Sequence, residues 1–107
     1  MDISGTSFME EDNSKTFPAV INWNHGGNEV RIVGAFNHWK EGIPLSRSHD
    51  DFNTVLNLPP GTHEFKFLVD GELRCSNDFP TVLDARGNLT NYVEVVPVSV
   101  LFVMFFV

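Results

Sequence analysis

The sequence predicts an all-β protein, folded as an antiparallel β-sandwich. Short runs of alternating apolar and polar residues are separated by turn signals about every ten residues, which is typical of this fold class. No window of the sequence shows a helical period flanked by capping residues. The chain has 107 residues, of which 42 % are hydrophobic, so it can enclose one core and one small domain.

The first two strands are expected at residues 19–23 (AVINW) and 29–36 (EVRIVGAF), with the polar NHGGN turn between them. Trp23 lies in the apolar part of the first strand and is expected in the core. The third strand, residues 52–58 (FNTVLNL), places Phe52, Leu56 and Leu58 on one face and Val55 alone on the other.

Pro59-Pro60-Gly61 then turns the chain into a fourth strand, residues 63–70 (HEFKFLVD), which closes on the hairpin signal Asp70-Gly71. Residues 90–96 (TNYVEVV) form the last expected strand. Two sheets packed face to face would bury the alternating apolar rows of these strands. The side chains expected inside are Val30, Ile32, Phe65, Phe67, Val69 and Val93.

The composition divides the chain into three parts. Residues 1–16 are polar and acidic and are expected to be a disordered leader. Residues 17–96 form the predicted sandwich module. Residues 97–107 (PVSVLFVMFFV) are almost entirely apolar but cover only about half of a membrane span. This tail is open to three interpretations: an extra strand, an unprotected aggregation-prone end, or an artefact of a truncated or misread gene model.

Charge and cysteine content exclude several classes of function. The formal net charge is −7 at pH 7, which argues against nucleic acid or an anionic membrane surface as a partner. The N-terminal residues lack the pattern of a signal peptide, and the single Cys75 cannot form an intrachain disulfide. We therefore expect no membrane span and a cytoplasmic location, with the nucleus as a second compartment.

The residue patterns also argue against catalysis and cofactors. The four histidines, at positions 25, 38, 49 and 63, are scattered without metal-ligand spacing. No nucleophile elbow, phosphate-binding loop or dinucleotide glycine motif is present. Asp50 and Asp51 are neighbours in a polar turn and would point apart. We therefore expect neither an enzyme nor a metal or cofactor.

Two residues suggest a binding surface instead. Trp39 lies in the polar, turn-like run GAFNHWK (residues 34–40), where its flat ring could stack on the apolar face of a sugar. The alternative for Trp39 is a core position at the edge of the sandwich. Lys66 lies on the polar face of its strand and offers three rotatable donors to sugar hydroxyls, although it could equally be a solvated lysine.

Three motifs resemble one known family. Gly34-x-Phe36-Asn37-x-Trp39, Pro44-Leu45 and LPPGTHEFKFLVDG (residues 58–71) resemble the glycogen-binding module of AMP-activated protein kinase β subunits, a family-48 type carbohydrate-binding module. The resemblance covers about residues 17–96. It implies a non-catalytic, immunoglobulin-like sandwich that binds glycogen or another α-1,4-glucan and contacts the kinase α subunit. The γ subunit would be a partner only if a further C-terminal region exists.

The resemblance also implies a set of site residues. Trp39 matches the first platform tryptophan, Lys66 matches the sugar-binding lysine, and Ser48, after Arg47, matches a regulatory phosphosite. The second platform tryptophan is replaced by Leu73, which offers no flat ring. The remaining candidate carbohydrate-binding residues are Asn37, Arg86, Asn88 and Thr90, with Arg86 at the position of an apolar wedge.

The loss of one platform predicts that glucan binding is weak, because an aromatic contact contributes roughly 1 kcal/mol. The alternative function is a protein-interaction module that keeps only the contact with the kinase domain.

Overall fold

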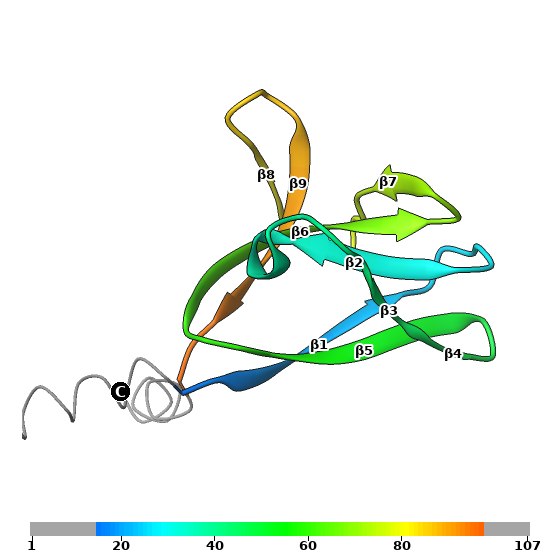
Figure 1. Cartoon of the computed structure of the whole chain (residues 1–107), viewed down its shortest axis with the longest axis horizontal. Coiled ribbons are helices and arrows are strands. Elements are labelled where there is room, and N and C mark those ends of the chain that lie inside the picture. The colour runs from blue at the N-terminus through cyan, green and yellow to red at the C-terminus, as the bar shows by residue number, and fades with distance from the viewer. Residues whose placement is uncertain (1–14, 98–107) are drawn as a thin grey trace, which may run out of the picture.

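The computed structural model describes residues 15–97 and consists of two antiparallel sheets that face each other (Figure 1). The three-stranded sheet has the order β1-β5-β4, formed by β1 (Phe17–Trp23), β5 (Asp51–Leu58) and β4 (Ser46–Ser48). The six-stranded sheet has the order β3-β2-β6-β9-β8, and β7 also pairs with β6. Its strands are β2 (Val30–Gly34), β3 (Ile43–Pro44), β6 (Gly61–Val69), β7 (Glu72–Arg74), β8 (Thr81–Leu83) and β9 (Leu89–Val95).

The predicted antiparallel β-sandwich is confirmed. Residues 1–14 of the predicted leader and 98–107 of the predicted tail lie outside the described residues, so the expectations for these two segments stay predictions. The described part of the chain contains no helix that is long and apolar enough to cross a membrane.

The alternation of side chains places the core between the two sheets. In β6, Phe65 and Phe67 are fully buried, and Val69 is also buried. Trp23 is buried as predicted, and its indole Nε1 donates a hydrogen bond to the carbonyl oxygen of Gly26 at 2.8 Å. Val93, expected inside, is only partly buried and packs against the core cluster. The buried cluster comprises Ile21, Trp23, Val30, Ile32, Leu45, Phe52, Phe65, Phe67 and Val69.

The second expected strand is shorter than the sequence suggested. β2 ends at Gly34, and residues Ala35–Asn37 form the 3-10 helix η1. The physical reason is the space beside Gly34, where a Cβ atom would lie 2.5 Å from the Phe36 ring and 2.6 Å from the carbonyl oxygen of Glu64. The absence of a side chain at this position lets Phe36 fold back over the strand and ends the extended run.

A buried amide fixes the long connection between β7 and β8. Asn91 in β9 has no solvent exposure, and its Oδ1 accepts the N–H of Ser76 at 2.8 Å. Its Nδ2 donates to the carbonyl oxygen of Ser76 at 2.8 Å and to that of Phe79 at 3.3 Å. One side chain thus satisfies several backbone groups that have no strand partner, and it holds Phe79 against Phe65 and Phe67.

We predict that Asn91→Ala lowers the free energy of unfolding by roughly 2–4 kcal/mol, because it leaves both backbone groups of Ser76 buried without a partner. Urea unfolding followed by tryptophan fluorescence measures the change. Asn53→Ala, an exposed asparagine on β5, is the control and should alter stability by less than about 0.5 kcal/mol. Equal effects of the two substitutions would contradict the structural role of Asn91.

Candidate functional site

Trp39 lies in a tight turn directly after η1, and its side chain is 44 % exposed. Its backbone N–H donates to the carbonyl oxygen of Gly34 at 2.9 Å. His38 and Trp39 both adopt left-handed backbone conformations, with φ angles of 59° and 58°. Such a conformation costs a residue with a side chain about 1–2 kcal/mol. The expected partial exposure of Trp39 is confirmed, and the alternative of a core tryptophan at this position is excluded.

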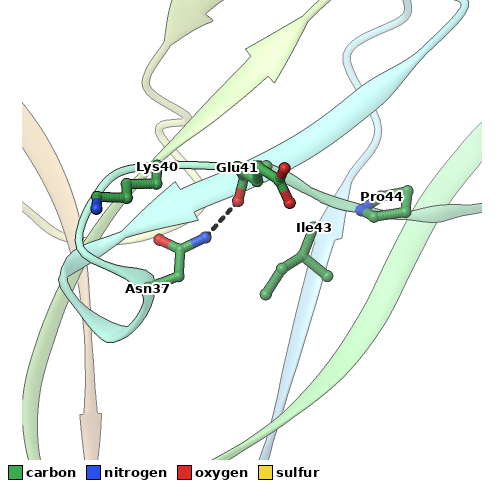
Figure 2. Close-up of a pocket in the computed structure, with 6 residues that line it drawn as sticks. Asn37, Lys40, Glu41, Ile43 and Pro44 are labelled. Atoms are coloured by element: carbon green, nitrogen blue, oxygen red, sulfur yellow. Dashed lines mark hydrogen bonds between the residues drawn. The ribbon is translucent and has the colours of Figure 1, made fainter.

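Asn37 fixes the turn that presents Trp39. Its Oδ1 accepts the N–H of Gly34 at 3.0 Å, and its Nδ2 donates to the carbonyl oxygen of Glu41 at 2.5 Å. Figure 2 shows this amide reaching across the turn to Glu41. Asn37 was expected to bind sugar hydroxyls, but both ends of its amide are engaged with the backbone. The structure therefore indicates that Asn37 positions Trp39 by holding the turn in which Trp39 lies.

A shallow hollow of about 520 Å³ lies beside this turn (Figure 2). It is lined by Asn37, Lys40, Glu41, Gly42, Ile43 and Pro44. Lys40 follows Trp39 directly in the sequence, but Trp39 is not among the residues that line the hollow.

Lys66 and Leu73 lie on the outer face of the six-stranded sheet. Lys66 pairs with Val33, the residue before Gly34, which brings it to the same end of the β2–β6 pair as the Trp39 turn. Leu73 pairs with Leu68, two residues beyond Lys66 on β6, and it is 59 % exposed. The alternation of side chains along β6 puts Lys66 and Leu68 on the same face.

The loop between β8 and β9 has its own anchor, Asp84. Its Oδ1 accepts the backbone N–H groups of Arg86 and Asn88, each at 2.9 Å. The backbone of Asp84 also bonds to Asn88 and to Gly87. The loop is therefore a well-formed hairpin tip, and Arg86 and Asn88 project from it as exposed side chains. In Figure 1 this hairpin extends away from the body of the sandwich.

Thr90 does not have the role expected from the sequence. It is only 1 % exposed, and its Oγ1 donates to the carbonyl oxygen of Phe65 at 3.0 Å. The hydroxyl proton is thus used to hold β9 against β6, at the point where their regular pairing ends with Phe65 and Asn91. Thr90 supports the hairpin and is not available to a sugar hydroxyl in this structure.

The hydrogen bond from the Asn88 N–H lowers the pKa of Asp84 below its ordinary value, against an opposing effect of desolvation. The N–H of Arg86 and the positive charges of Lys66 and Arg86 act in the same direction as Asn88. Asp84 is a site residue that the sequence analysis missed, although an aspartate before x-x-Gly-Asn is a common turn signal.

A second cluster of polar residues lies away from this face. His25 Nε2 contacts both Asp78 Oδ2 at 2.8 Å and the Ser76 hydroxyl at 3.4 Å. A catalytic relay needs the serine and the carboxylate on opposite ring nitrogens, and an accessible serine. Here both share one nitrogen, and Ser76 is buried. Within residues 15–97, no group of three or more His, Cys, Asp or Glu side chains could hold a metal ion.

Ser48 is exposed and lies on β4, at the opposite sheet from Trp39 and Lys66. It pairs with Asp51 at the β4–β5 turn. The sequence placed Ser48 in a polar stretch that was expected to be exposed, and the structure shows it exposed at the end of a short edge strand. Its role as a phosphosite stays a prediction.

The titration of Asp84 can be predicted from this geometry. The ionised carboxylate of Asp84 accepts both hydrogen bonds, so these bonds are fully formed at a pH above the ordinary pKa of an aspartate. They weaken as the pH falls through the lowered pKa of Asp84, where the carboxylate becomes protonated. In NMR spectra, the amide protons of Arg86 and Asn88 should titrate together with a midpoint below that of an ordinary aspartate. Asp84→Asn should remove this transition, while Asp51→Asn should leave it. A shared midpoint at or above the ordinary value would refute the assignment.

Comparison with known proteins places this chain in a family. Residues 17–100 match the family described as the glycogen recognition site of AMP-activated protein kinase. The chain is 47 % identical over 92 residues to the β subunit of 5'-AMP-activated protein kinase from Schizosaccharomyces pombe, covering 86 % of this chain and 30 % of that protein. It is 45 % identical over 78 residues to the mouse β-2 subunit, covering 73 % of this chain and 29 % of that protein.

The SNF1 protein kinase subunit β-3 of Saccharomyces cerevisiae is 42 % identical over 94 residues, covering 85 % of this chain and 22 % of that protein. The chain thus spans less than a third of the length of these relatives. The match includes all nine strands and both segments that carry the candidate site, the Trp39 turn and the β8–β9 hairpin. The chain therefore belongs to the family of glycogen recognition sites of AMP-activated protein kinase.

Proposed function

We propose that this chain is a non-catalytic carbohydrate-binding module that binds glycogen or a related α-1,4-glucan through the outer face of its six-stranded sheet. We further propose that it acts as part of a kinase β subunit and contacts the kinase α subunit. The relatives named as β subunits of AMP-activated protein kinase support this assignment.

One observation carries the proposal: Trp39 combines a strained backbone with an exposed ring. An exposed indole loses the free energy of burial, and a left-handed φ angle adds about 1–2 kcal/mol. Strained residues of this kind persist at ligand sites because the surrounding structure holds them in place. At Trp39, the hydrogen bonds of Asn37 and Gly34 supply that restraint.

The chemistry of the surface suits a sugar. A pyranose ring has a flat apolar face of C–H groups that an indole can cover, and a rim of hydroxyls that bind to nearby polar groups. The ammonium group of Lys66 can donate hydrogen bonds to these hydroxyls, and the exposed amide of Asn88 can both donate and accept them. Leu73 supplies apolar contact without a flat ring, so we expect the affinity to be low.

A second candidate function rests on the other sheet. Val20 and Val55 form an exposed cross-strand pair, and the alternation along β5 puts Asp51 and its partner Ser48 on the same outer face. This face offers an apolar patch beside a serine that a kinase could modify, which suits a contact with the kinase domain. A module that is phosphorylated on Ser48 by a co-expressed catalytic subunit, yet is not retained by glycogen, would support this function alone.

We predict that a native gel containing immobilised glycogen retards the protein and that Trp39→Ala abolishes the retardation. Loss of the stacked ring should weaken binding about tenfold or more. Leu83→Ala, another exposed apolar residue, is the control and should migrate like the unmodified protein. Equal migration of the unmodified protein with and without glycogen would rule out the carbohydrate-binding function.

Leu73→Trp is predicted to strengthen glucan binding by on the order of 1 kcal/mol, or several-fold in affinity. Because Leu73 is exposed at the surface, the larger ring should leave the melting temperature almost unchanged. Isothermal titration with maltoheptaose and a melting curve test both points.

Leu83→Trp is the matched control for this prediction. Val82 pairs with Thr90, and Leu83, the next residue along β8, faces the opposite side of the hairpin. It should bring no gain in affinity. A several-fold gain from Leu83→Trp, or none from Leu73→Trp, would show that the missing ring does not limit binding.

A further inference from the structure

Tyr92, the only tyrosine in the sequence, lies on the outer face of the six-stranded sheet. Its neighbour Val93 packs against the core cluster, so the alternation of side chains along β9 directs Tyr92 to the opposite face, where it is partly exposed. Its backbone N–H donates to the carbonyl oxygen of Pro80 at 3.0 Å, and Tyr92 pairs with Glu64 of β6. Tyr92 is therefore held on a fixed strand with part of its side chain open to solvent.

The strand register surrounds Tyr92 with polar residues. Glu64 is its direct partner, and Glu64 and Lys66 alternate with the buried rings of β6, so both lie on the outer face. The Cβ atoms of direct partners lie about 4.5–5.5 Å apart, and those of diagonal neighbours such as Tyr92 and Lys66 about 7–8 Å. The contacts between aromatic rings within residues 15–97 involve other residues, namely Trp23, His25, Phe65, Phe67 and Phe79. The ring of Tyr92 thus lies beside a carboxylate and an ammonium group and not against another ring.

The Trp39 turn is attached to the other edge of β6 at the same level. Gly34 and Asn91 both pair with Phe65, so these three residues form one row across β2, β6 and β9. Neighbouring strands lie about 4.8 Å apart, which puts β2 and β9 roughly 10 Å apart in this row. The Trp39 turn is bonded to Gly34, and Tyr92 follows Asn91 directly. The turn and Tyr92 therefore flank β6 within the length of a short oligosaccharide.

We propose that Tyr92 is the second aromatic contact of the carbohydrate site and that Glu64 accepts hydrogen bonds from the sugar hydroxyls, so that the glucan crosses β6 from the Trp39 turn to β9. This inference rests on the proposed carbohydrate-binding function and adds two residues to its site. A tyrosine ring can cover the apolar face of a pyranose ring, as an indole can. The carboxylate of Glu64 only accepts hydrogen bonds, which complements the donors of Lys66.

The position of Tyr92 also bears on the ring that Leu73 lacks. Leu73 pairs with Leu68, and Tyr92 pairs with Glu64, so the two residues lie on opposite sides of Lys66 along β6. Tyr92 thus supplies an aromatic ring at one end of this surface, while the other end offers only an aliphatic side chain.

The single tyrosine allows a direct test on the full chain, because incorporation of fluorotyrosine labels position 92 alone. During a titration with maltoheptaose, the fluorine NMR signal should shift with the same midpoint as the heat of binding in isothermal titration. Binding heat without a fluorine shift at saturation would overturn the inference and leave the proposed function standing. Neither heat nor shift would overturn the proposed function together with the inference.

Two substitutions separate the ring from the rest of the side chain. Tyr92→Leu removes the flat ring and should weaken maltoheptaose binding about three- to tenfold, whereas Tyr92→Phe keeps the ring and should stay within about twofold of the unmodified protein. Melting curves of both variants report whether the fold is kept. Equal affinities of the two folded variants would refute the ring contact, and the fluorine signal of the unmodified protein decides the matter if Tyr92→Leu does not fold.

Glu64→Gln tests the carboxylate and should weaken binding about threefold, because hydrogen bonds to an ionised acceptor are stronger than those to a neutral one. Glu94→Gln is the matched control, since Glu94 is exposed on the same face of β9, two residues beyond Tyr92, and pairs with Thr62. It makes the same change of charge and should leave the affinity unchanged. Equal weakening by both substitutions would indicate a general effect of charge and refute the assignment of Glu64.

Discussion

The burial of Phe65 and Phe67 fixes the orientation of β6, and each part of the candidate site is attached to that strand. With these two rings in the core, the alternation of side chains directs Lys66 and Leu68 outward. β2 pairs along one edge of β6 and leads into the Trp39 turn. β9 and β7 share the other edge, and they carry the β8–β9 hairpin and Leu73. A slip of one residue in β6 would turn Lys66 inward and dismantle the site.

Several polar side chains in this protein form hydrogen bonds to backbone groups instead of facing solvent alone. Asn37 holds the Trp39 turn, Asp84 holds the hairpin tip, Thr90 joins β9 to β6, and Asn91 holds the β7–β8 connection. Each of them satisfies backbone groups that the strands leave without a partner, which would otherwise be costly to bury. In the β7–β8 connection this anchor acts together with Phe79, which packs against the core.

The same anchors decide which groups remain available to a ligand. Since the amide of Asn37 and the hydroxyl of Thr90 are engaged with the backbone, the candidate residues that keep a side chain for a ligand are Trp39, Lys66, Leu73, Arg86 and Asn88.

The sequence by itself determined the sandwich, its long strands and most of its core. Apolar residues at every second position give each strand one apolar face, and two sheets packed face to face bury these faces. The strands at residues 52–58 and 63–70 agree with β5 and β6 to within two residues, and the core positions of Trp23, Phe65 and Phe67 were predicted correctly. The Trp39 motif, Pro44-Leu45 and the run from Leu58 to Gly71 together also indicated the family.

Only the tertiary structure decided that β2 ends at Gly34 and that the short strands β3, β4, β7 and β8 form. It also decided that Asn88 is exposed whereas Thr90 is buried. Strands of two or three residues carry no readable period, and they form because a neighbouring strand offers an open edge. The availability of a polar side chain likewise depends on which backbone groups lie beside it, and those groups come from segments far away in the sequence.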